Sequence, residues 1–257
     1  FDHLAQPAWK DRGGTIGVNE LMRVMDPLKE FAGQEGILLT DGQLDQFSLY
    51  MSLLLEWNQK MNLTAITQPE QIIVRHFLDS LLLFRYFPQK ENSSLIDIGT
   101  GAGFPGIPLK IWQPSLSLTL LDSLNKRLLF LREVCGKLGV SANLVHSRAE
   151  EGALKKEFRE RFDLATARAV ASMPLLCEYC LPYVRVGGKM ILMKGPECGE
   201  EVSSAAAALK LLGGEIEEIR EYQLPDGSGR TLIAVRKVRR TPAQYPRHGS
   251  KIAKSPL

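Results

Sequence analysis

Long apolar runs are missing from this sequence. The longest of them, such as residues 53–55 and 81–84, fall far short of the ~18 residues that a membrane-spanning helix requires. A basic N-terminal stretch followed by an apolar block and a small-residue cleavage site is also missing. We therefore predict a cytoplasmic protein with no membrane partner. The chain begins at Phe1 rather than Met, which leaves an organellar targeting segment open.

Close pairs of metal-binding residues are scarce. Among four cysteines and four histidines, Cys177 and Cys180 form the one close pair, and no second pair matches it. A structural zinc site needs such a second pair, so we predict no metal. The cysteine pair lies in a leucine-rich stretch typical of a buried helix, where free cysteine behaves as a small hydrophobe. Buried structural cysteines in a reducing compartment are the expected result.

Acidic residues are absent from the last part of the chain. Residues 227–257 hold eight Lys or Arg and no Asp or Glu, within a total net charge of +3. The remaining residues carry 24 cations against 29 anions, a net charge of −5. A basic segment on an acidic body is typical of a protein that contacts a polyanion at one place. The alternative is a solvated tail that only improves solubility.

The residues before position 90 show helical spacing. Apolar side chains recur about one helical turn apart at Leu44, Phe47, Met51 and Leu54, with Asp41 available as a cap. A second helix is predicted over residues 70–86. We therefore expect a small helical unit over residues 19–90, which follows a loose extension over residues 1–18.

After residue 90 the sequence alternates between strand and helix patterns. This alternation predicts an α/β fold with a doubly wound, mostly parallel sheet over residues 91–237 and helices on both faces. The last two strands are joined by the short segment LPDGSG, so we expect them to be antiparallel. A basic C-terminal tail over residues 238–257 follows. The strand candidates are residues 95–99, 116–122, 142–146, 162–167, 189–194, 215–219 and 231–237.

Three glycines follow the first predicted strand at alternate positions, in LIDIGTGAGFPGIPL. In open parallel sheets, ligands bind beyond the carboxyl ends of the strands, beside the point where the strand order reverses. Gly99, Gly101 and Gly103 let the backbone turn tightly and approach a ligand without side chains in the way. A helix that starts near Pro105 would direct its free N–H groups toward the same place.

Two cofactor classes fit this glycine turn. Residues 101–106 satisfy G-x-G-x-x-G, and Asp122 ends the second strand, where a carboxylate would bind ribose hydroxyls of NAD or of S-adenosylmethionine. Asp97 inside the strand favours S-adenosylmethionine, because its carboxylate would lie near an ammonium and a sulfonium. Gly106 falls in the helix start, where it closes no pyrophosphate loop. An NAD(P)-dependent oxidoreductase on the same sheet remains the alternative.

The runs IDIGTGAGFPGIPL, LLDSLNKRLLFL, SRAEE and TARAVAS resemble the RsmG (GidB) family. EWNQKMNLTAIT, HFLDS and YPRHGS extend the resemblance over nearly all of residues 41–257. The resemblance implies a Rossmann-like class I methyltransferase that uses S-adenosylmethionine to modify N7 of a guanosine in small-subunit ribosomal RNA. It also implies that the partner is this RNA or the assembling small subunit, and we expect a monomer. A non-catalytic RNA-binding assembly factor and a small-molecule methyltransferase are further alternatives.

The resemblance also implies site residues. Arg168, at the end of the fourth strand, would face the transfer site and orient the substrate; the alternative is a structural salt bridge with Asp97 or Glu150. Asn62, Arg75 and His76 are secondary candidates, and helix packing is the alternative role for His76. The expected cofactor-binding residues are Gly99, Gly101, Gly103, Phe104, Asp122, Ser123, Leu124, Ala149, Glu150 and Arg168. From their charge, the expected RNA-binding residues are Lys126, Arg127, Arg239, Arg240, Arg247 and Lys251; a solvated helix face is the alternative for Lys126 and Arg127.

Catalytic dyads are missing as well, and the implied reaction explains why. Guanine N7 has an exposed lone pair and no proton to lose, so methyl transfer to it needs no general base. The enzyme must instead align nucleophile, carbon and sulfur, which is an orientation effect. The Asn/Asp-Pro-Pro-aromatic motif of exocyclic-amine methylation is absent, since TARAVASMP stands in its place. Methylation at C5 of a pyrimidine would need a nucleophilic cysteine, and Cys177 and Cys180 lie in an apolar helix.

Overall fold

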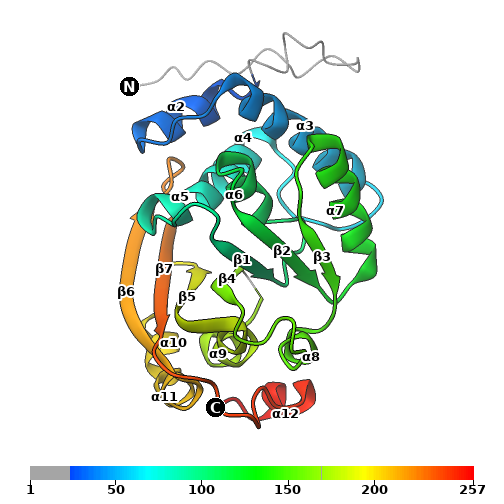
Figure 1. Ribbon diagram of the computed structural model, residues 1–257. Coiled ribbons are helices and arrows are strands. Elements are labelled where there is room, and N and C mark those ends of the chain that lie inside the picture. The colour runs from blue at the N-terminus through cyan, green and yellow to red at the C-terminus, as the bar shows by residue number, and fades with distance from the viewer. Residues whose placement is uncertain (1–23, 169) are drawn as a thin grey trace.

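The computed structural model describes residues 24–168 and 170–257 and contains a central sheet with helices on both sides (Figure 1). The extension that we expected to be loose, residues 1–18, lies outside the described part. Of the helical unit, the structure describes residues from 24 onward. In the described part, no helix is both long and apolar enough to cross a membrane.

The helical unit begins with α2 (Asp26–Gln34) and α3 (Asp41–Asn58), which lie at the top of Figure 1. Thr40 rather than Asp41 caps α3, because its hydroxyl accepts from the Gln43 N–H while the Gln43 side chain accepts from the Thr40 N–H. This capping box satisfies two backbone donors at once. The predicted cap was therefore wrong by one residue.

The second predicted helix is confirmed as one helical run with a changed pitch in its middle. It consists of α4 (Pro69–Ile72), the π-helical segment η1 (Ile73–Leu78) and α5 (Asp79–Tyr86). Pro69 at the first turn has no N–H to leave unpaired. A π segment inside an α-helix is rare and is frequent at functional sites. Here it contains Arg75 and His76.

The sheet contains seven strands in the order β3-β2-β1-β4-β5-β7-β6. The first five strands are parallel, and β7 pairs antiparallel with both β5 and β6. The mostly parallel sheet and its antiparallel end are thus confirmed. The chain reverses its direction across the sheet between β1 and β4. The strands are β1 (Ser94–Ile98), β2 (Ser117–Asp122), β3 (Asn143–His146), β4 (Phe162–Arg168), β5 (Val184–Lys194), β6 (Gly214–Gln223) and β7 (Gly229–Lys237).

Helices cover both faces of the sheet, and the alternation of strand side chains explains the two layers. In β1, Leu95 joins the core shared with the helical unit, whereas Ile96 and Ile98 join the core on the opposite face. The first core includes α6 (Gly106–Trp112) and α7 (Asn125–Leu138). The second includes α9 (Met173–Cys180), the 3₁₀ turn η2 (Leu181–Tyr183) and α11 (Ala206–Leu212). The short helices α8 (Ala149–Gly152) and α10 (Gly199–Ser204) complete the crossovers.

Buried cysteines were predicted, and three of the four are buried in the core. Cys135, Cys177 and Cys180 are buried free thiols, and Cys198 is half-buried. Burial raises the pKa of the Cys135 thiol to about 11 and that of Cys177 to about 12. A thiol with a raised pKa is a poor nucleophile, because the thiolate is the reactive form.

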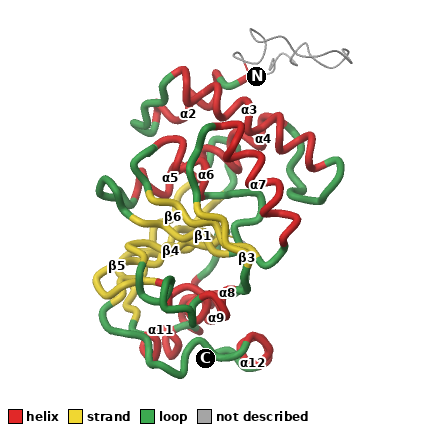
Figure 2. The backbone as a smooth tube through the Cα atoms, turned by 45° about the vertical axis from the view of Figure 1, so that its right-hand side comes forward, coloured by secondary structure: helices red, strands yellow, loops and turns green. Residues whose placement is uncertain are grey.

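Residues 238–257, which we call the C-terminal tail, follow β7 and end in α12 (Gly249–Lys254). Figures 1 and 2 both show α12 at the bottom of the molecule beside α8 and α9, and far from the helical unit. The tail is therefore packed against the layer that contains α9, and Ile252 within it is fully buried.

Candidate active site

The glycine turn lies at the carboxyl end of β1, where the strand order reverses. Gly99, Gly101 and Gly103 have φ angles of +64°, +61° and +94°, which L-residues with side chains rarely adopt. The Gly99 N–H donates to the Leu121 carbonyl at 2.9 Å, and the Gly101 N–H donates to Asp122 Oδ2 at 2.9 Å. The turn is thus fixed to the end of β2, and α6 begins directly after it.

One side of this turn is open. A methyl carbon added at Gly101 would meet only the Gly99 carbonyl oxygen, at 4.0 Å. Two apolar side chains lie beside the opening, namely Leu124 after β2 (41% exposed) and Val170 after β4 (40% exposed). Asp122 lies directly behind the opening and is 1% exposed, with its Oδ2 accepting from the Gly101 N–H and its Oδ1 from the Leu124 N–H. Exposed apolar side chains beside bare backbone, with a carboxylate behind them, fit a ligand with an apolar ring and a ribose. The residues present therefore fit an adenosyl group.

Gly103 and Phe104 face the interior, which differs from the expectation that they line the pocket surface. A methyl carbon at Gly103 would lie 2.6 Å from Tyr50 Oη and 2.7 Å from Ile107 Cδ1. The Phe104 ring is 4% exposed and stacks on His76 with the ring centroids 4.5 Å apart. The Tyr50 hydroxyl donates to the Ala102 carbonyl, so α3 supports the turn from behind.

Asp97 also lies inside the protein, which corrects its expected place beside a ligand. It is 0% exposed, and its Oδ2 accepts from Thr100 Oγ1 at 2.7 Å and from the Gly106 N–H at 3.0 Å. Its other carboxylate oxygen, Oδ1, has no hydrogen-bond partner. Burial raises the pKa of this carboxyl from 3.8 to about 7, although both hydrogen bonds act in the opposite direction. Asp97 holds the glycine turn and the start of α6 together.

The raised pKa of Asp97 predicts a pH-dependent stability. The folded protein binds one more proton at this carboxyl than the unfolded chain between pH 3.8 and about 7. This carboxyl therefore lowers the free energy of unfolding as the pH rises through that window, and its penalty is complete above pH 7. In Asp97→Asn this contribution is absent. Urea unfolding from pH 4 to 8 should show the wild type losing stability relative to the variant as the pH rises; parallel curves would contradict the assignment.

Arg168, the last residue of β4, points toward the π-helical segment. It donates to the Arg75 carbonyl at 3.1 Å and to His76 Nδ1 at 3.0 Å, and its guanidinium carbon lies 5.0 Å from the Phe104 ring centroid. Its side chain is 17% exposed. The structure therefore brings together Arg75, His76, Phe104 and Arg168, four of the residues singled out in the sequence. Asn62 is exposed in the loop between α3 and α4.

His76 is held as a neutral ring. Because Arg168 can only donate, His76 Nδ1 accepts, and the Nε2–H then donates to Thr64 Oγ1 at 2.9 Å. Burial, together with the neighbouring Arg168, lowers the pKa of His76 from 6.5 to about 3. Both ring nitrogens are engaged, so His76 has no free position for general acid or base chemistry. Its role here is to pack against Phe104 and position Arg168.

Asp79 is the partner of Arg168 that the sequence analysis missed. Its Oδ2 lies 3.7 Å from Arg168 Nη1 and 3.4 Å from Arg230 Nε, and its Oδ1 accepts from the Tyr222 hydroxyl at 2.7 Å. The salt bridges from Arg168 to Asp97 or Glu150 that we considered are not formed. One signal was present in the sequence, because Asp79 is the single carboxylate within the apolar run over residues 72–84.

The hairpin between β6 and β7 contacts the π-helical segment. Arg75 Nε donates to Asp226 Oδ2 at 2.6 Å, and Asp226 lies in the turn that joins the two strands. Together with the contacts of Tyr222 and Arg230 to Asp79, this contact ties the antiparallel end of the sheet to the helical unit. These long-range contacts place Arg168 and its partner Asp79 beside the hairpin.

The segment after β3 forms another side of the opening beside the glycine turn. The Ser147 N–H donates to the Asp122 carbonyl at 3.2 Å, which places the start of α8 beside the end of β2. Ala149 is half-buried and Glu150 is 8% exposed. Ser123 is exposed, and the Leu124 N–H donates to Asp122 Oδ1 at 2.9 Å. The expected cofactor-binding residues of these two segments thus lie at the adjacent carboxyl ends of β2 and β3.

The expected RNA-binding cations divide into two groups. Arg127 is 34% exposed and lies 3.3 Å from Asp122, and Arg247 is 14% exposed and bonded to the buried Glu178, so both are paired with a carboxylate of the protein. Lys126, Arg239, Arg240 and Lys251 are exposed. The expected phosphate contact of Arg247 would compete with its pair to Glu178. Two cations of β7 are also paired internally, Arg230 with Asp79 and the fully buried Lys237 with Glu160.

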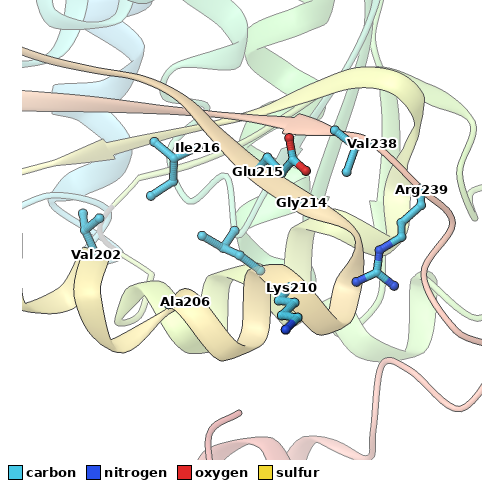
Figure 3. A pocket seen from close by; sticks show the side chains of 9 residues that line it. Val202, Ala206, Lys210, Gly214, Glu215, Ile216, Val238 and Arg239 are labelled. Carbon is cyan, nitrogen blue, oxygen red and sulfur yellow. The ribbon is translucent and has the colours of Figure 1, made fainter.

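A hollow of about 490 Å³ lies elsewhere, between α10, α11 and the beginning of β6 (Figure 3). Figure 3 shows Lys210 and Arg239 near one end of this hollow and Val202 near the other. It lies near the start of β6 and the end of β7, away from the glycine turn, so it is separate from the candidate active site. Among the described residues, no cluster of His, Cys, Asp or Glu could hold a metal ion.

Comparison with known proteins gives a family match over most of the chain. Residues 43–228 match the GidB family, described as rRNA small subunit methyltransferase G. A protein of Acetivibrio thermocellus named ribosomal RNA small subunit methyltransferase G is 50% identical over 232 residues, which cover 90% of this chain and 95% of that protein. The protein of the same name from Alkaliphilus metalliredigens is 48% identical, with 90% and 97% covered.

Solved structures with low sequence identity share the fold. A branched-chain polyamine synthase mutein from Thermus thermophilus superposes with a TM-score of 0.55 at 13% identity, covering 75% of this chain and 64% of that one. A protein from Bacillus halodurans, described as a putative methyltransferase, superposes with a TM-score of 0.50 at 16% identity. That match covers 63% of this chain and 100% of the other.

Proposed function

The chain belongs to the rRNA small subunit methyltransferase G family, and from this we propose that it methylates N7 of a guanosine in small-subunit ribosomal RNA. The cofactor is S-adenosylmethionine. The observation that carries the proposal is the open glycine turn at the strand-order reversal, bounded by Asp122, Leu124 and Val170. Family membership also decides against an NAD(P)-dependent oxidoreductase on the same sheet.

We assign the cofactor to the carboxyl ends of β1, β2 and β3. Gly101 offers bare backbone, whereas Val170 lies against Gly99. Asp122, which is 1% exposed, would provide the carboxylate for the ribose, and Leu124 an apolar surface for the adenine. Ser123, Ala149 and Glu150 complete the wall at the ends of β2 and β3. Gly103 and Phe104 act from inside, by letting α3 and His76 pack against the turn. When bound, the cofactor supplies an electrophilic methyl group on a sulfonium.

The chain's residues supply orientation rather than proton transfer. Guanine N7 would accept the methyl group that the bound cofactor supplies, and because N7 carries no proton, no residue of the chain would need to remove one. His76 is neutral with both nitrogens engaged, which agrees with a reaction that needs no base. We assign Arg168 to guanine O6 or a phosphate, because arginine is the commonest partner of the guanine edge while N7 must stay free. Asp79 and His76 fix its direction.

The test of this function is methyl incorporation with mapping of the modified base. Small-subunit RNA from a strain that lacks the enzyme is incubated with the protein and tritiated S-adenosylmethionine, as naked RNA and as assembled subunits. Borohydride reduction followed by aniline cleaves RNA at 7-methylguanosine and locates the product. We expect one cleavage site. Cofactor binding without incorporation into either substrate would support a non-catalytic assembly factor instead.

The exposed cations of the C-terminal tail predict a salt effect on RNA binding. We expect Arg239→Ala/Arg240→Ala to reduce the slope of log K against log salt by about 1.5, since each phosphate contact contributes roughly 0.7–0.9. The matched control is Lys60→Ala/Lys90→Ala, which removes two exposed cations from the helical unit and should leave the slope unchanged. Filter binding of RNA between 50 and 200 mM salt measures both. Equal slopes for all three proteins would remove the tail from the RNA interface.

A further inference from the structure

The C-terminal tail is anchored where it leaves the sheet. The buried Lys237 donates to the Leu181 carbonyl at 2.6 Å and to Thr241 Oγ1 at 2.7 Å. Arg159, just before β4, donates to the carbonyls of Thr241 at 3.1 Å and Tyr245 at 2.8 Å. Such contacts between a charged side chain and backbone carbonyls fix the path of the tail. The first part of the tail is therefore packed on the protein by specific hydrogen bonds, in contrast to the solvated tail considered in the sequence analysis.

A second anchor follows in the middle of the tail. Arg247 donates through Nη2 to Glu178 Oε2 at 2.7 Å and through Nε to Glu178 Oε1 at 2.9 Å, and its backbone N–H donates to the same Oε1 at 2.7 Å. Glu178, on α9, is 1% exposed. A bidentate pair with one buried partner sets both distance and direction. It directs the last ten residues toward α8.

Beyond this anchor, α12 packs against α9 and touches α8 through Gly249 and Glu150. Gly249 faces Glu150 so closely that a methyl carbon added there would lie 2.9 Å from Glu150 Cδ and nearer still to Oε1. Figures 1 and 2 both show α12 beside α8. Ile252 of α12 is fully buried, which fixes α12 in this place. The tail therefore covers the Glu150 side chain from outside.

Two further contacts hold helix α8, and one of them comes from Arg159, which also binds the tail. The Tyr183 hydroxyl donates to the Ala149 carbonyl at 2.6 Å. Arg159, which binds the tail carbonyls, also donates to the Ala153 carbonyl at 3.5 Å. Since the Ser147 N–H binds the Asp122 carbonyl, this short helix joins the tail to the end of β2.

We propose that the C-terminal tail is a strap that positions Glu150 and α8, so that Arg247 and Gly249 are positioning residues for cofactor binding. This rests on the proposed function, in which Ala149 and Glu150 form part of the cofactor wall. The tail then has two faces. Its buried side, through Arg247 and Gly249, orders α8, and its exposed cations Arg239 and Arg240 remain available for RNA.

Gly249→Ala tests the strap with a single methyl group aimed at the Glu150 carboxylate. The φ angle of Gly249 lies outside the left-handed region, so the backbone itself accepts alanine. We expect the Kd for S-adenosylmethionine to rise about tenfold, because the crowded carboxylate must move. The RNA affinity and the kcat at saturating cofactor should stay within twofold. Calorimetry measures cofactor binding, and initial rates separate KM from kcat.

The matched control is Gly199→Ala. Gly199 is also the first residue of a short helix, α10, but a methyl carbon there meets nothing within 4 Å. This variant should bind the cofactor as the wild type does. A second test is truncation after His248, which removes α12 and keeps the Arg247–Glu178 pair. It too should weaken cofactor binding, and its RNA salt slope should fall because the exposed Lys251 and Lys254 are removed together with α12.

The outcomes separate the strap from the function on which it rests. If the wild type binds S-adenosylmethionine and Gly249→Ala binds it equally well, the strap is wrong and the proposed function stands. If truncation after His248 changes the RNA salt slope but not the cofactor Kd, the end of the tail serves RNA alone and the strap is again wrong. If the wild type itself binds no S-adenosylmethionine, the proposed function fails and the strap falls with it.

Discussion

Replacing Arg168 by Met is expected to lower kcat/KM for methyl transfer about a hundredfold, the scale of a misplaced reactant, while the protein stays folded. Met keeps the apolar stem that packs on Phe104 and removes the guanidinium at the carboxyl end of β4. Asp79 keeps Arg230 and Tyr222 as partners, so no carboxylate is left buried without a donor. Initial rates of tritiated methyl incorporation and urea unfolding measure the two effects.

Two further variants define what this result means. Arg168→Lys keeps the charge but lacks the planar fork that reaches both the Arg75 carbonyl and His76, so we expect an intermediate loss of about tenfold. The control is Arg185→Met, because Arg185 forms a salt bridge with Asp163 on the surface and should not affect the rate. If Arg168→Met kept more than half of the wild-type activity, the assignment of Arg168 to substrate orientation would be wrong.

Arg247→Ala is expected to reduce the free energy of unfolding by about 3 kcal/mol, because breaking a buried ion pair leaves one charge uncompensated. Glu178 is 1% exposed and takes three hydrogen-bond donors from Arg247 alone. The substitution removes the two side-chain donors and opens space beside the carboxylate. Urea unfolding followed by circular dichroism measures the change.

An exposed arginine from the same tail provides the control. Arg240 is 86% exposed and lies 4.0 Å from Glu160, so Arg240→Ala should change the stability by less than about 0.5 kcal/mol. The double variant Glu178→Leu/Arg247→Met should be more stable than Arg247→Ala, since it replaces both charges with apolar groups. Equal, small effects of Arg247→Ala and Arg240→Ala would show that the pair contributes nothing to folding.

Much of the fold could be predicted because its signals are local. Each strand from β1 to β7 was found from a short local pattern, which was an apolar run in most strands and EIEEI in β6, and the antiparallel end of the sheet followed from the brief turn between β6 and β7. Strand boundaries moved by a few residues, most of all at β5, which begins at Val184 rather than at residue 189. The pitch change in η1 left no such signal, because α and π segments share the same apolar residues.

The candidate site was predicted in part. Gly99, Gly101, Asp122 and Leu124 lie at adjoining strand ends, as their positions after β1 and β2 required. Asp97 was expected beside the ligand but lies in the interior, since sequence spacing shows that a carboxylate lies within a strand but not which way its oxygens face. The role of Asp79 was missed because its partners, Arg168 and Arg230, come from β4 and β7.

The sequence by itself determined the order of the elements, the place of the glycine turn and the resemblance that led to the reaction. All of these depend on spacing between near neighbours along the chain. The tertiary structure alone decided which charges remain free. The eight cations after residue 226 look alike in the sequence, yet Arg247 is bonded to Glu178, 69 residues away, while Arg240 is exposed to solvent. Burial and pairing depend on which distant segments meet, and only the folded chain brings those segments together.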